Sequence, residues 1–370
     1  MYEKETKIML SSNSAWNLAN FRKPVIEALV AAGYDVVAVA PADGSERQLE
    51  AMGARFRPVR MRGAGTSLIE DSRLLRDYIR LLRDERPAMF FGFTAKPNIY
   101  GSLAARLTNV PIAATISGLG SAFLKGGLLG ELLLRLYRVA LGRAQAIFFQ
   151  NIADRELFIA RRIAHPGQAR LVAGSGIDLG RFAPVPMAKN DNFRFLLIGR
   201  LLFDKGIAEY VAAARLVRAK HPQARFQLLG GSADDNPSAV PPSELERWGD
   251  EKIVELLGMH DDVRPFIAAA DCIVLPSYRE GLPRSLLEGA AMARPLIASD
   301  VPGCREVVDH GVNGLLCDVR SPASLVAAME QMLEMTTQAR AAMGAAGRRK
   351  VEAEFDQRLV AAAYLAEIAR

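Results

Sequence analysis

The sequence predicts an α/β protein of two lobes, each built around a parallel sheet of the Rossmann kind. The chain has 370 residues, which is too many for one compact domain and about right for two. Half of the residues are apolar, and short apolar runs alternate with segments of helical period almost from end to end. Strands separated by helices are typical of right-handed βαβ units, which form parallel sheets.

The expected strands of the first lobe are short apolar runs. They occupy residues 7–11, 36–40, 56–60, 89–93, 112–116, 146–149 and 170–172. The segments between them have helical period. In the segment 22–32, Asn20 is the expected N-cap and Gly33 is the expected stop.

The second lobe begins after a loop of small residues and prolines near residue 175. The alternation restarts there, with expected strands at 195–198, 226–229, 253–257, 272–275 and 296–298. We therefore expect lobes of 1–175 and 176–355. Because open parallel sheets bind ligands beyond the carboxyl ends of their strands, we expect the two lobes to face a central ligand cleft.

Composition argues against several other classes of protein. The charged start of the chain lacks the apolar core of a secretory signal, and the apolar stretch 126–150 is interrupted by four charged residues. Three cysteines and four scattered histidines match neither a disulfide framework nor a zinc site. We expect a cytoplasmic protein with reduced thiols and no metal.

Charge is distributed unevenly along the chain. Residues 1–175 carry 24 Lys and Arg against 15 Asp and Glu, whereas residues 176–370 carry 23 against 26. A basic first half indicates an anionic partner, for which nucleic acid, a membrane surface and a phosphorylated substrate are all candidates.

A basic loop follows the expected strand 195–198. Arg200 and Lys205 lie between Gly199 and Gly206, directly before a helix. Glycine lets the backbone approach a ligand closely, and a helix N-terminus favours negative charge. The two cations could therefore clamp a diphosphate, although a solvated basic loop would have the same sequence.

A pair of glutamates follows the expected strand 272–275. Glu280 and Glu288 lie about two helical turns apart, and Pro283 suits the first turn of a helix. If the helix begins early, both carboxylates lie on nearly the same side, and amides near Gly281 and Leu282 are available to a ligand. Glu288 could then accept hydrogen bonds from a ribose. The alternative is that Glu280 caps the helix and Glu288 faces water.

These motifs resemble the signature of the family 4 retaining glycosyltransferases, which have the GT-B fold. The run 270–283 carries the resemblance, and the Gly-Arg-x4-Lys-Gly loop, the Glu-x7-Glu pair and residues 299–303 and 313–315 follow the family's order. Residues 93–101, 116–123, 234–239 and 303–306 resemble a bacterial subgroup that extends sugars on polyprenyl diphosphate, the N,N'-diacetylbacillosaminyl-diphospho-undecaprenol alpha-1,3-N-acetylgalactosaminyltransferase type.

The resemblance implies a GT-B fold with an acceptor-binding first lobe and a second lobe that binds the nucleotide sugar. It also implies a C-terminal helix, 356–370, that crosses back to the first lobe. The resemblance further implies that the donor is a UDP-sugar and that neither a metal nor a cofactor takes part. The implied catalytic residues are Glu280, Arg200 and Lys205.

The implied donor-binding residues surround these three. Arg200 and Lys205 would hold the diphosphate beside Gly199, and Glu288 would accept both ribose hydroxyls. Glu280, with the amides at Gly281, Leu282 and Pro283, would face the donor sugar.

The acceptor side departs from the family pattern. The family's histidine after the fifth strand is replaced by 115–118, and its glycine-rich first loop is replaced by 12–17. Asn17, Lys96 and Asn98 are candidates for acceptor contacts by their position alone.

The basic half fits a lipid-linked saccharide as acceptor. Arginines at 55, 57, 60 and 62 and a helical stripe at 73, 76, 80 and 83 could dock on anionic headgroups, together with the apolar segment 123–136. We therefore expect a peripheral protein on the inner face of the plasma membrane. A solvated helix face is the alternative for the stripe, and a buried helix of the first lobe is the alternative for residues 123–136.

Other functions remain as alternatives. A nucleotide-sugar epimerase of the same fold would act without an acceptor. A dinucleotide oxidoreductase would need a third glycine after 118–120, where Phe123 stands. A nucleic-acid binder is not expected, because no recognisable RNA or DNA module is present.

Overall fold

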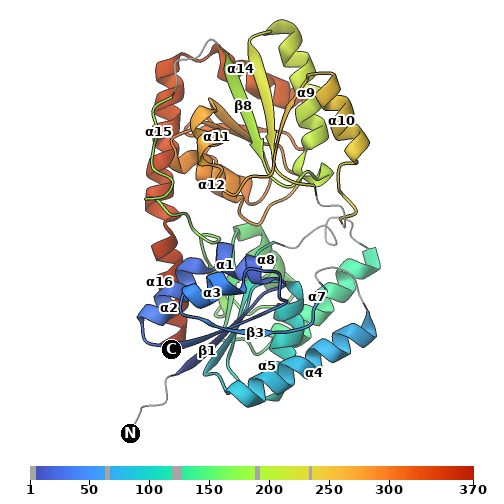
Figure 1. Cartoon of the computed structure of the whole chain (residues 1–370), viewed down its shortest axis with the longest axis vertical. Helices are drawn as coiled ribbons and strands as arrows, with labels where there is room; N and C mark the ends of the chain where they lie inside the picture. Colours follow the sequence, from blue (N-terminus) through green and yellow to red (C-terminus); the bar gives the residue numbers. More distant parts are fainter. Residues whose placement is uncertain (1–5, 63–66, 119–126, 188–191, 233–235) are drawn as a thin grey trace. The chain divides into compact units, whose positions relative to one another are not determined.

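The computed structural model describes residues 6–62, 67–118, 127–187, 192–232 and 236–370 (Figure 1). The chain forms two compact units, Met1–Gly176 with Gln357–Arg370, and Ile177–Asp356. Each unit contains one parallel sheet covered by helices. The prediction of two parallel-sheet α/β lobes is confirmed.

The first unit has a seven-stranded sheet of order β3-β2-β1-β4-β5-β6-β7. All neighbouring strands are parallel, with Ile8 opposite Val36 and Met89 in the register. The central strands are fully buried, which is why they read as continuous apolar runs. The strands are β1 (Lys7–Ser11), β2 (Asp35–Ala40), β3 (Arg55–Pro58), β4 (Met89–Gly92), β5 (Ile112–Ile116), β6 (Ala146–Phe149) and β7 (Ala169–Leu171).

One helix of the first unit has a different N-cap from the one expected. The predicted helix 22–32 is α2 (Lys23–Ala31), and its N-cap is Arg22. Asn20 is not a cap, because it lies within α1 (Ala15–Phe21), whose N-cap is Ser14. Gly33 ends α2 with φ +85°, as expected. The other helices are α3 (Glu46–Ala51), α4 (Leu68–Glu85), the π-helical turn η1 (Pro97–Gly101), α5 (Ser102–Leu107), α7 (Gly127–Leu141), α8 (Ile152–Ala160) and α16 (Gln357–Ile368).

The C-terminal helix α16 belongs to the first unit and lies beside α2 (Figure 1). Tyr364 is completely buried, and its hydroxyl is 2.7 Å from Thr115 Oγ1. Its ring packs against Phe91, Phe93 and Phe148, with centroids 4.5 to 5.7 Å apart. The last helix therefore completes the core between β4, β5 and β6.

The second unit has a six-stranded parallel sheet of order β10-β9-β8-β11-β12-β13. The strands are β8 (Phe193–Ile198), β9 (Ala224–Leu229), β10 (Glu255–Gly258), β11 (Cys272–Leu275), β12 (Leu296–Ser299) and β13 (Gly314–Cys317). Strand β13 was not among the expected strands. Strand order reverses between β8 and β11, which is where doubly wound sheets bind ligands.

Helices follow nearly every strand of this sheet. They are the short 3-10 helix η2 (Phe203–Lys205), α9 (Ile207–Lys220), α10 (Pro242–Asp250), α11 (Arg264–Ala269), α12 (Arg284–Ala291), α13 (Cys304–Val307), α14 (Pro322–Glu334) and α15 (Thr337–Glu354). Over the described ranges, no helix is both long and apolar enough to cross a membrane.

Glu85 forms a buried ionic cluster at the end of α4. Its carboxylate accepts hydrogen bonds from Lys7 at 3.0 Å, Arg55 at 3.1 Å and Arg57 at 2.8 Å. Arg55 also binds Asp35. Arg55 and Arg57 are therefore engaged within the fold, but their side chains are 45% and 47% exposed, and their docking on headgroups stays a prediction.

We expect Glu85→Gln to destabilise the protein by about 2–3 kcal/mol at pH 7, the worth of hydrogen bonds to a charged group. Burial alone would raise the pKa of Glu85, but the three cations lower it from 4.5 to about 2. This stability is therefore present above pH 4.5 and is lost as the pH falls toward 2. Chemical denaturation should show a smaller difference between variant and parent at pH 3 than at pH 7.

The control for this prediction is Glu27→Gln. Glu27 makes an exposed ion pair with Lys23 on α2, which is worth at most about 0.5 kcal/mol. An equal effect of the two variants, or an effect of Glu85→Gln that does not change with pH, would contradict the prediction.

Candidate functional site

Two loops meet at the point where the order of the second sheet reverses. Residues 199–206 follow β8, and residues 276–283 follow its neighbour β11. The Tyr278 amide donates to the Asp204 carbonyl at 2.9 Å, and Ser277 Oγ donates to the same oxygen at 3.1 Å. The loops are therefore fastened to each other through the backbone.

Two glycines permit close packing against loop 276–283, Gly206 from the loop after β8 and Gly303 from the loop after β12. Gly206 has φ +71°, and a Cβ there would lie 2.0 Å from the Pro276 carbonyl oxygen. Gly303 has φ +86°, and a Cβ there would lie 2.7 Å from the Glu280 carbonyl oxygen. Any larger residue would separate the loops that carry the predicted site.

The loops bring Lys205 and Glu280 together. Lys205 Nζ lies 2.5 Å from Glu280 Oε1, and both side chains are mostly buried. Arg200 lies in the same loop with an exposed side chain, and no ion pair holds it in the described part of the chain. The site thus presents one cation that is fixed by a carboxylate and one that is available to an anion.

Glu288 is buried on α12 and does not face water. Its side chain is 10% exposed, and Oε1 accepts a hydrogen bond from Arg284 Nε at 2.8 Å. Burial raises the pKa of Glu288 despite the neighbouring guanidinium. Burying a carboxylate lowers the stability of the fold, and such unfavourable burial is typical of groups that bind a ligand.

Two details of this segment differ from expectation. Helix α12 begins at Arg284, so Glu280 precedes the helix and the two glutamates do not share a helical face. Pro283 is the N-cap and has no N–H, so it cannot donate a hydrogen bond to a sugar. Donors from this segment must come from Gly281, Leu282 or the first turn of α12.

A second contact, between loop 276–283 and α9, was not predicted from the sequence. The Tyr278 hydroxyl donates to Glu209 Oε1 on α9 at 2.8 Å. These residues are 69 positions apart and belong to no shared motif. Nothing in the sequence pattern indicated that they would meet.

Two of the predicted acceptor residues, Asn17 and Asn98, differ in how much of their side chain is exposed. Asn17 is half-buried on α1, and its side chain accepts a hydrogen bond from Ser12 Oγ at 2.8 Å. Asn98 is 1% exposed, and its amide donates to the Thr115 carbonyl at 2.9 Å. Asn98 thus supports η1 and β5 from within and presents almost no surface to a ligand.

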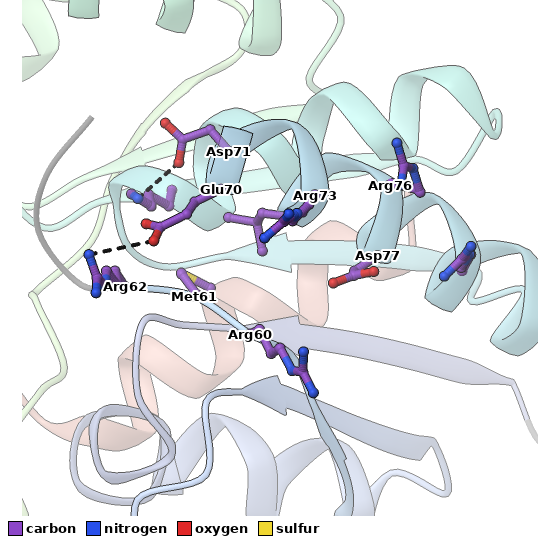
Figure 2. A pocket seen from close by; sticks show the side chains of 11 residues that line it. Arg60, Met61, Arg62, Glu70, Asp71, Arg73, Arg76 and Asp77 are labelled. Atoms are coloured by element: carbon purple, nitrogen blue, oxygen red, sulfur yellow. Dashed lines mark hydrogen bonds and ion pairs between the residues drawn. The ribbon is translucent and has the colours of Figure 1, made fainter. Parts of the chain in front are cut away.

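Lys96 lines a basic cavity of about 450 Å³, which we call the arginine hollow. Figure 2 shows this hollow with most of its lining residues labelled. The hollow opens between α4 and the segment after β3, near the carboxyl ends of β3 and β4. It is lined by Arg60, Met61, Arg62, Glu70, Asp71, Arg73, Leu74, Arg76, Asp77, Arg80 and Lys96.

Cations outnumber acids in the arginine hollow. Lys96 Nζ binds Asp71 Oδ1 at 2.9 Å, and Arg62 lies 3.5 Å from Glu70 (Figure 2). The remaining basic side chains form no ion pair with any described residue. They are Arg60, Arg73, Arg76 and Arg80. Four exposed guanidinium groups without counter-ions favour an anionic ligand.

Exposed apolar side chains begin α4 beside the hollow. Leu68 is 88% exposed and Ile69 is 67% exposed. The predicted motif positions 119–123, the start of the apolar segment 123–136 and residues 234–235 lie outside the described residues. Leu132 and Val139, on the described part of α7, are also exposed.

No cluster of three or more His, Cys, Asp or Glu is placed to hold a metal ion within the described ranges. The three cysteines are free and buried. Burial raises the pKa of each thiol, as expected for reduced side chains in the core.

The fold matches known glycosyltransferase structures. The structure of HepE from Anabaena, in complex with UDP and glucose, superposes with a TM-score of 0.82 at 19% identity. The match covers 99% of this chain and 100% of that one. This likeness establishes the fold.

Curated relatives point to the same group of enzymes. An N,N'-diacetylbacillosaminyl-diphospho-undecaprenol alpha-1,3-N-acetylgalactosaminyltransferase of Campylobacter jejuni is 26% identical over 345 residues, covering 89% of each chain. A UDP-Gal:alpha-D-GlcNAc-diphosphoundecaprenol alpha-1,3-galactosyltransferase of Escherichia coli is 25% identical over 282 residues, covering 72% of each.

Two protein families match consecutive parts of the chain. "Glycosyl transferase 4-like domain" matches residues 22–174, and "Glycosyl transferases group 1" matches residues 192–335. Together they account for most of the sequence, and they confirm the predicted family. The chain therefore belongs to the GT-B glycosyltransferases of these two families.

Proposed function

We propose that this protein is a retaining enzyme that moves a hexose or N-acetylhexosamine from a UDP-sugar to a saccharide on polyprenyl diphosphate. Its product would serve the assembly of a surface glycan or a glycoprotein glycan. The observation that carries this proposal is the Lys205–Glu280 pair at the switch point of the second sheet, with Glu288 buried on the helix that follows. Named relatives that act on undecaprenyl-diphosphate-linked saccharides support the acceptor.

Charge on the departing diphosphate is the main demand of this reaction. The bond from the anomeric carbon to the diphosphate oxygen breaks, and the acceptor oxygen attacks from the same face. Its proton passes to the diphosphate. Lys205, which Glu280 holds at 2.5 Å, and Arg200 would stabilise the developing charge without moving.

Retention through a covalent intermediate needs a free carboxylate close to the anomeric carbon. Glu280 is engaged by Lys205, and Glu288 is engaged by Arg284. These contacts favour front-face attack over a glycosyl-enzyme intermediate. Glu280 and the amides of Gly281 and Leu282 would then orient the sugar.

We expect Glu288→Ala to weaken UDP binding by about 1.5–3 kcal/mol, because a carboxylate loses its hydrogen bonds to the ribose. Calorimetric titration of UDP would measure this loss as roughly a tenfold to hundredfold rise in Kd. Glu330→Ala is the matched control, since Glu330 only makes an exposed ion pair with Lys220. Unchanged UDP affinity in Glu288→Ala would refute the ribose assignment.

Transfer to an undecaprenyl-diphosphate-linked saccharide tests the function directly. UDP-hexoses and UDP-N-acetylhexosamines are supplied in turn, and the product linkage is read by NMR. We expect a product with the anomeric configuration of the donor. Release of an epimer without acceptor, or a product of inverted configuration, would overturn the proposal.

We expect EDTA to leave this transfer intact. Arginine and lysine side chains can neutralise a diphosphate without a divalent cation, and Arg200 and Lys205 are placed in one loop to do so. The rate is compared in EDTA and in excess magnesium. Loss of activity in EDTA that magnesium restores would contradict the metal-free mechanism.

We further propose that the first unit docks on the anionic inner face of the plasma membrane through the arginine hollow. Each basic residue near such a surface contributes roughly 1 kcal/mol, and exposed Leu68 and Ile69 can insert beside it. Sedimentation with anionic vesicles should be lost in Arg73→Glu/Arg76→Glu. It should persist in Arg215→Glu/Arg218→Glu, which makes the same charge change on α9. Equal loss of vesicle binding in both double variants would contradict the proposal that the arginine hollow is the docking surface.

A further inference from the structure

Two side-chain contacts join loop 276–283 to the segment that contains Lys205. Lys205 contacts Glu280 at 2.5 Å. Tyr278, two residues before Glu280, donates to Glu209 Oε1 at 2.8 Å. Glu209 lies in the first turn of α9, four residues after Lys205. The Tyr278–Glu209 contact therefore joins the same two segments of the chain as the Lys205–Glu280 contact.

The surroundings of Tyr278 fix its hydroxyl as a hydrogen-bond donor. Burial and the neighbouring Glu209 raise the pKa of Tyr278 to about 12, so the phenol keeps its proton at neutral pH. The Arg320 guanidinium packs over the ring, 4.4 Å from its centroid. The ring is thus held on one side while the hydroxyl points to the carboxylate.

Glu209 depends on this bond. Its Oε1 accepts from Tyr278, and its Oε2 is buried without a hydrogen-bond partner among the described residues. A buried carboxylate with one partner is costly to leave unsatisfied. This incompletely hydrogen-bonded carboxylate lies close in the chain to Lys205, one of the two predicted diphosphate-binding cations, and to Gly206, which has a left-handed conformation. A buried polar atom that lacks a hydrogen-bond partner in a native structure is often part of a functional site.

We propose that Tyr278 and Glu209 are positioning residues that hold Lys205 and Glu280 in place for the donor diphosphate. This inference rests on the donor site proposed above. Lys205 ends the single turn of η2, and Glu280 lies in the loop before α12, so neither side chain is positioned by a long helix or a strand. A displacement of about 1 Å at such a group lowers reactivity strongly.

Tyr210 provides a matched control. It follows Glu209 on α9, is completely buried, and its hydroxyl donates to the Phe195 carbonyl at 2.8 Å. Phenylalanine at either position removes one hydroxyl, and at position 210 it also removes hydrogen bonds with the Gln227 backbone at 3.2 and 3.3 Å. Tyr210 contacts the sheet and makes no hydrogen bond to loop 276–283, so Tyr210→Phe reports a merely structural loss.

The test measures UDP affinity by calorimetry and Tm by thermal unfolding in the full chain. We expect Tyr278→Phe to weaken UDP binding by about fivefold to tenfold, which is less than a direct hydrogen bond to a charged group is worth, because Tyr278 acts through Lys205 and does not contact UDP. Tyr210→Phe should lower Tm and leave UDP affinity within about twofold. Glu209→Gln retains an acceptor oxygen for Tyr278 and should restore most of the affinity that Glu209→Ala loses.

A double-mutant cycle shows whether Tyr278 acts through Lys205. If it does, Tyr278→Phe has no further effect on UDP affinity in the Lys205→Ala background. Additive losses would overturn the proposal, as would equal UDP affinities of Tyr278→Phe and Tyr210→Phe. If the parent protein fails to bind UDP, or if Lys205→Ala binds UDP unchanged, the donor-site assignment itself fails.

Discussion

Replacing Lys205 by alanine is expected to lower the rate of sugar transfer by about a hundredfold to a thousandfold, the effect of removing one preorganised donor from a developing oxyanion. Lys205 suits that role because the protein fixes it before any ligand arrives. Its Nζ lies 2.5 Å from Glu280 Oε1, and its side chain is only 21% exposed. The cation therefore needs little reorganisation as charge builds on the diphosphate.

Steady-state kinetics with saturating acceptor would measure this effect as a fall in kcat. Lys205→Arg should retain part of the rate, since it keeps the charge but changes its geometry. Lys220→Ala serves as control, because Lys220 is exposed and binds Glu330 at the surface of the same unit. A loss confined to KM for the donor would show that Lys205 binds the ground state and the transition state equally.

Gly206→Ala is expected to destabilise the second unit by several kcal/mol and to abolish UDP binding. A left-handed conformation costs a non-glycine residue about 1–2 kcal/mol. The new Cβ would also lie 2.0 Å from the Pro276 carbonyl oxygen, and such overlap costs roughly 1–3 kcal/mol more. Relief of the overlap would move the loop that carries Lys205 away from the loop that carries Glu280.

Gly258→Ala separates these two contributions. Gly258 has φ +73°, almost the value at Gly206, but no atom lies within 4 Å of a Cβ built there. Denaturation of both variants should therefore show the conformational cost alone at Gly258 and the added overlap at Gly206. UDP titration should find normal affinity in Gly258→Ala. Equal stability of the two variants would mean that the close approach of the loops is not required.

The donor-side loops could be predicted because their signals are local. Apolar runs marked β8 and β11, and each functional loop follows its strand directly, so topology brought the loops together. The start of α12 was harder to place, since Pro283 suits both a cap and a first turn. Strand β13 was missed because four residues after a glycine-rich turn carry little periodicity.

Long-range contacts explain the remaining differences between the predicted site residues and the structure. The charge of Arg55 and Arg57 indicated a docking surface, but Glu85, about 30 positions away, engages both. Asn98 read as an accessible polar residue, yet the π-helical turn η1 directs its amide to β5. Sequence patterns report which residues are charged or polar, but only tertiary contacts decide which of them are already satisfied.

The insertion of Tyr364 among the strands of the first unit sets an order for folding during synthesis. The core of that unit needs the ring of Tyr364 against Phe91, Phe93 and Phe148. Residues 177–356 form a unit of their own and leave the ribosome before this ring does. A released chain truncated after residue 356 should therefore hold a folded second unit, while its first unit remains open to proteases.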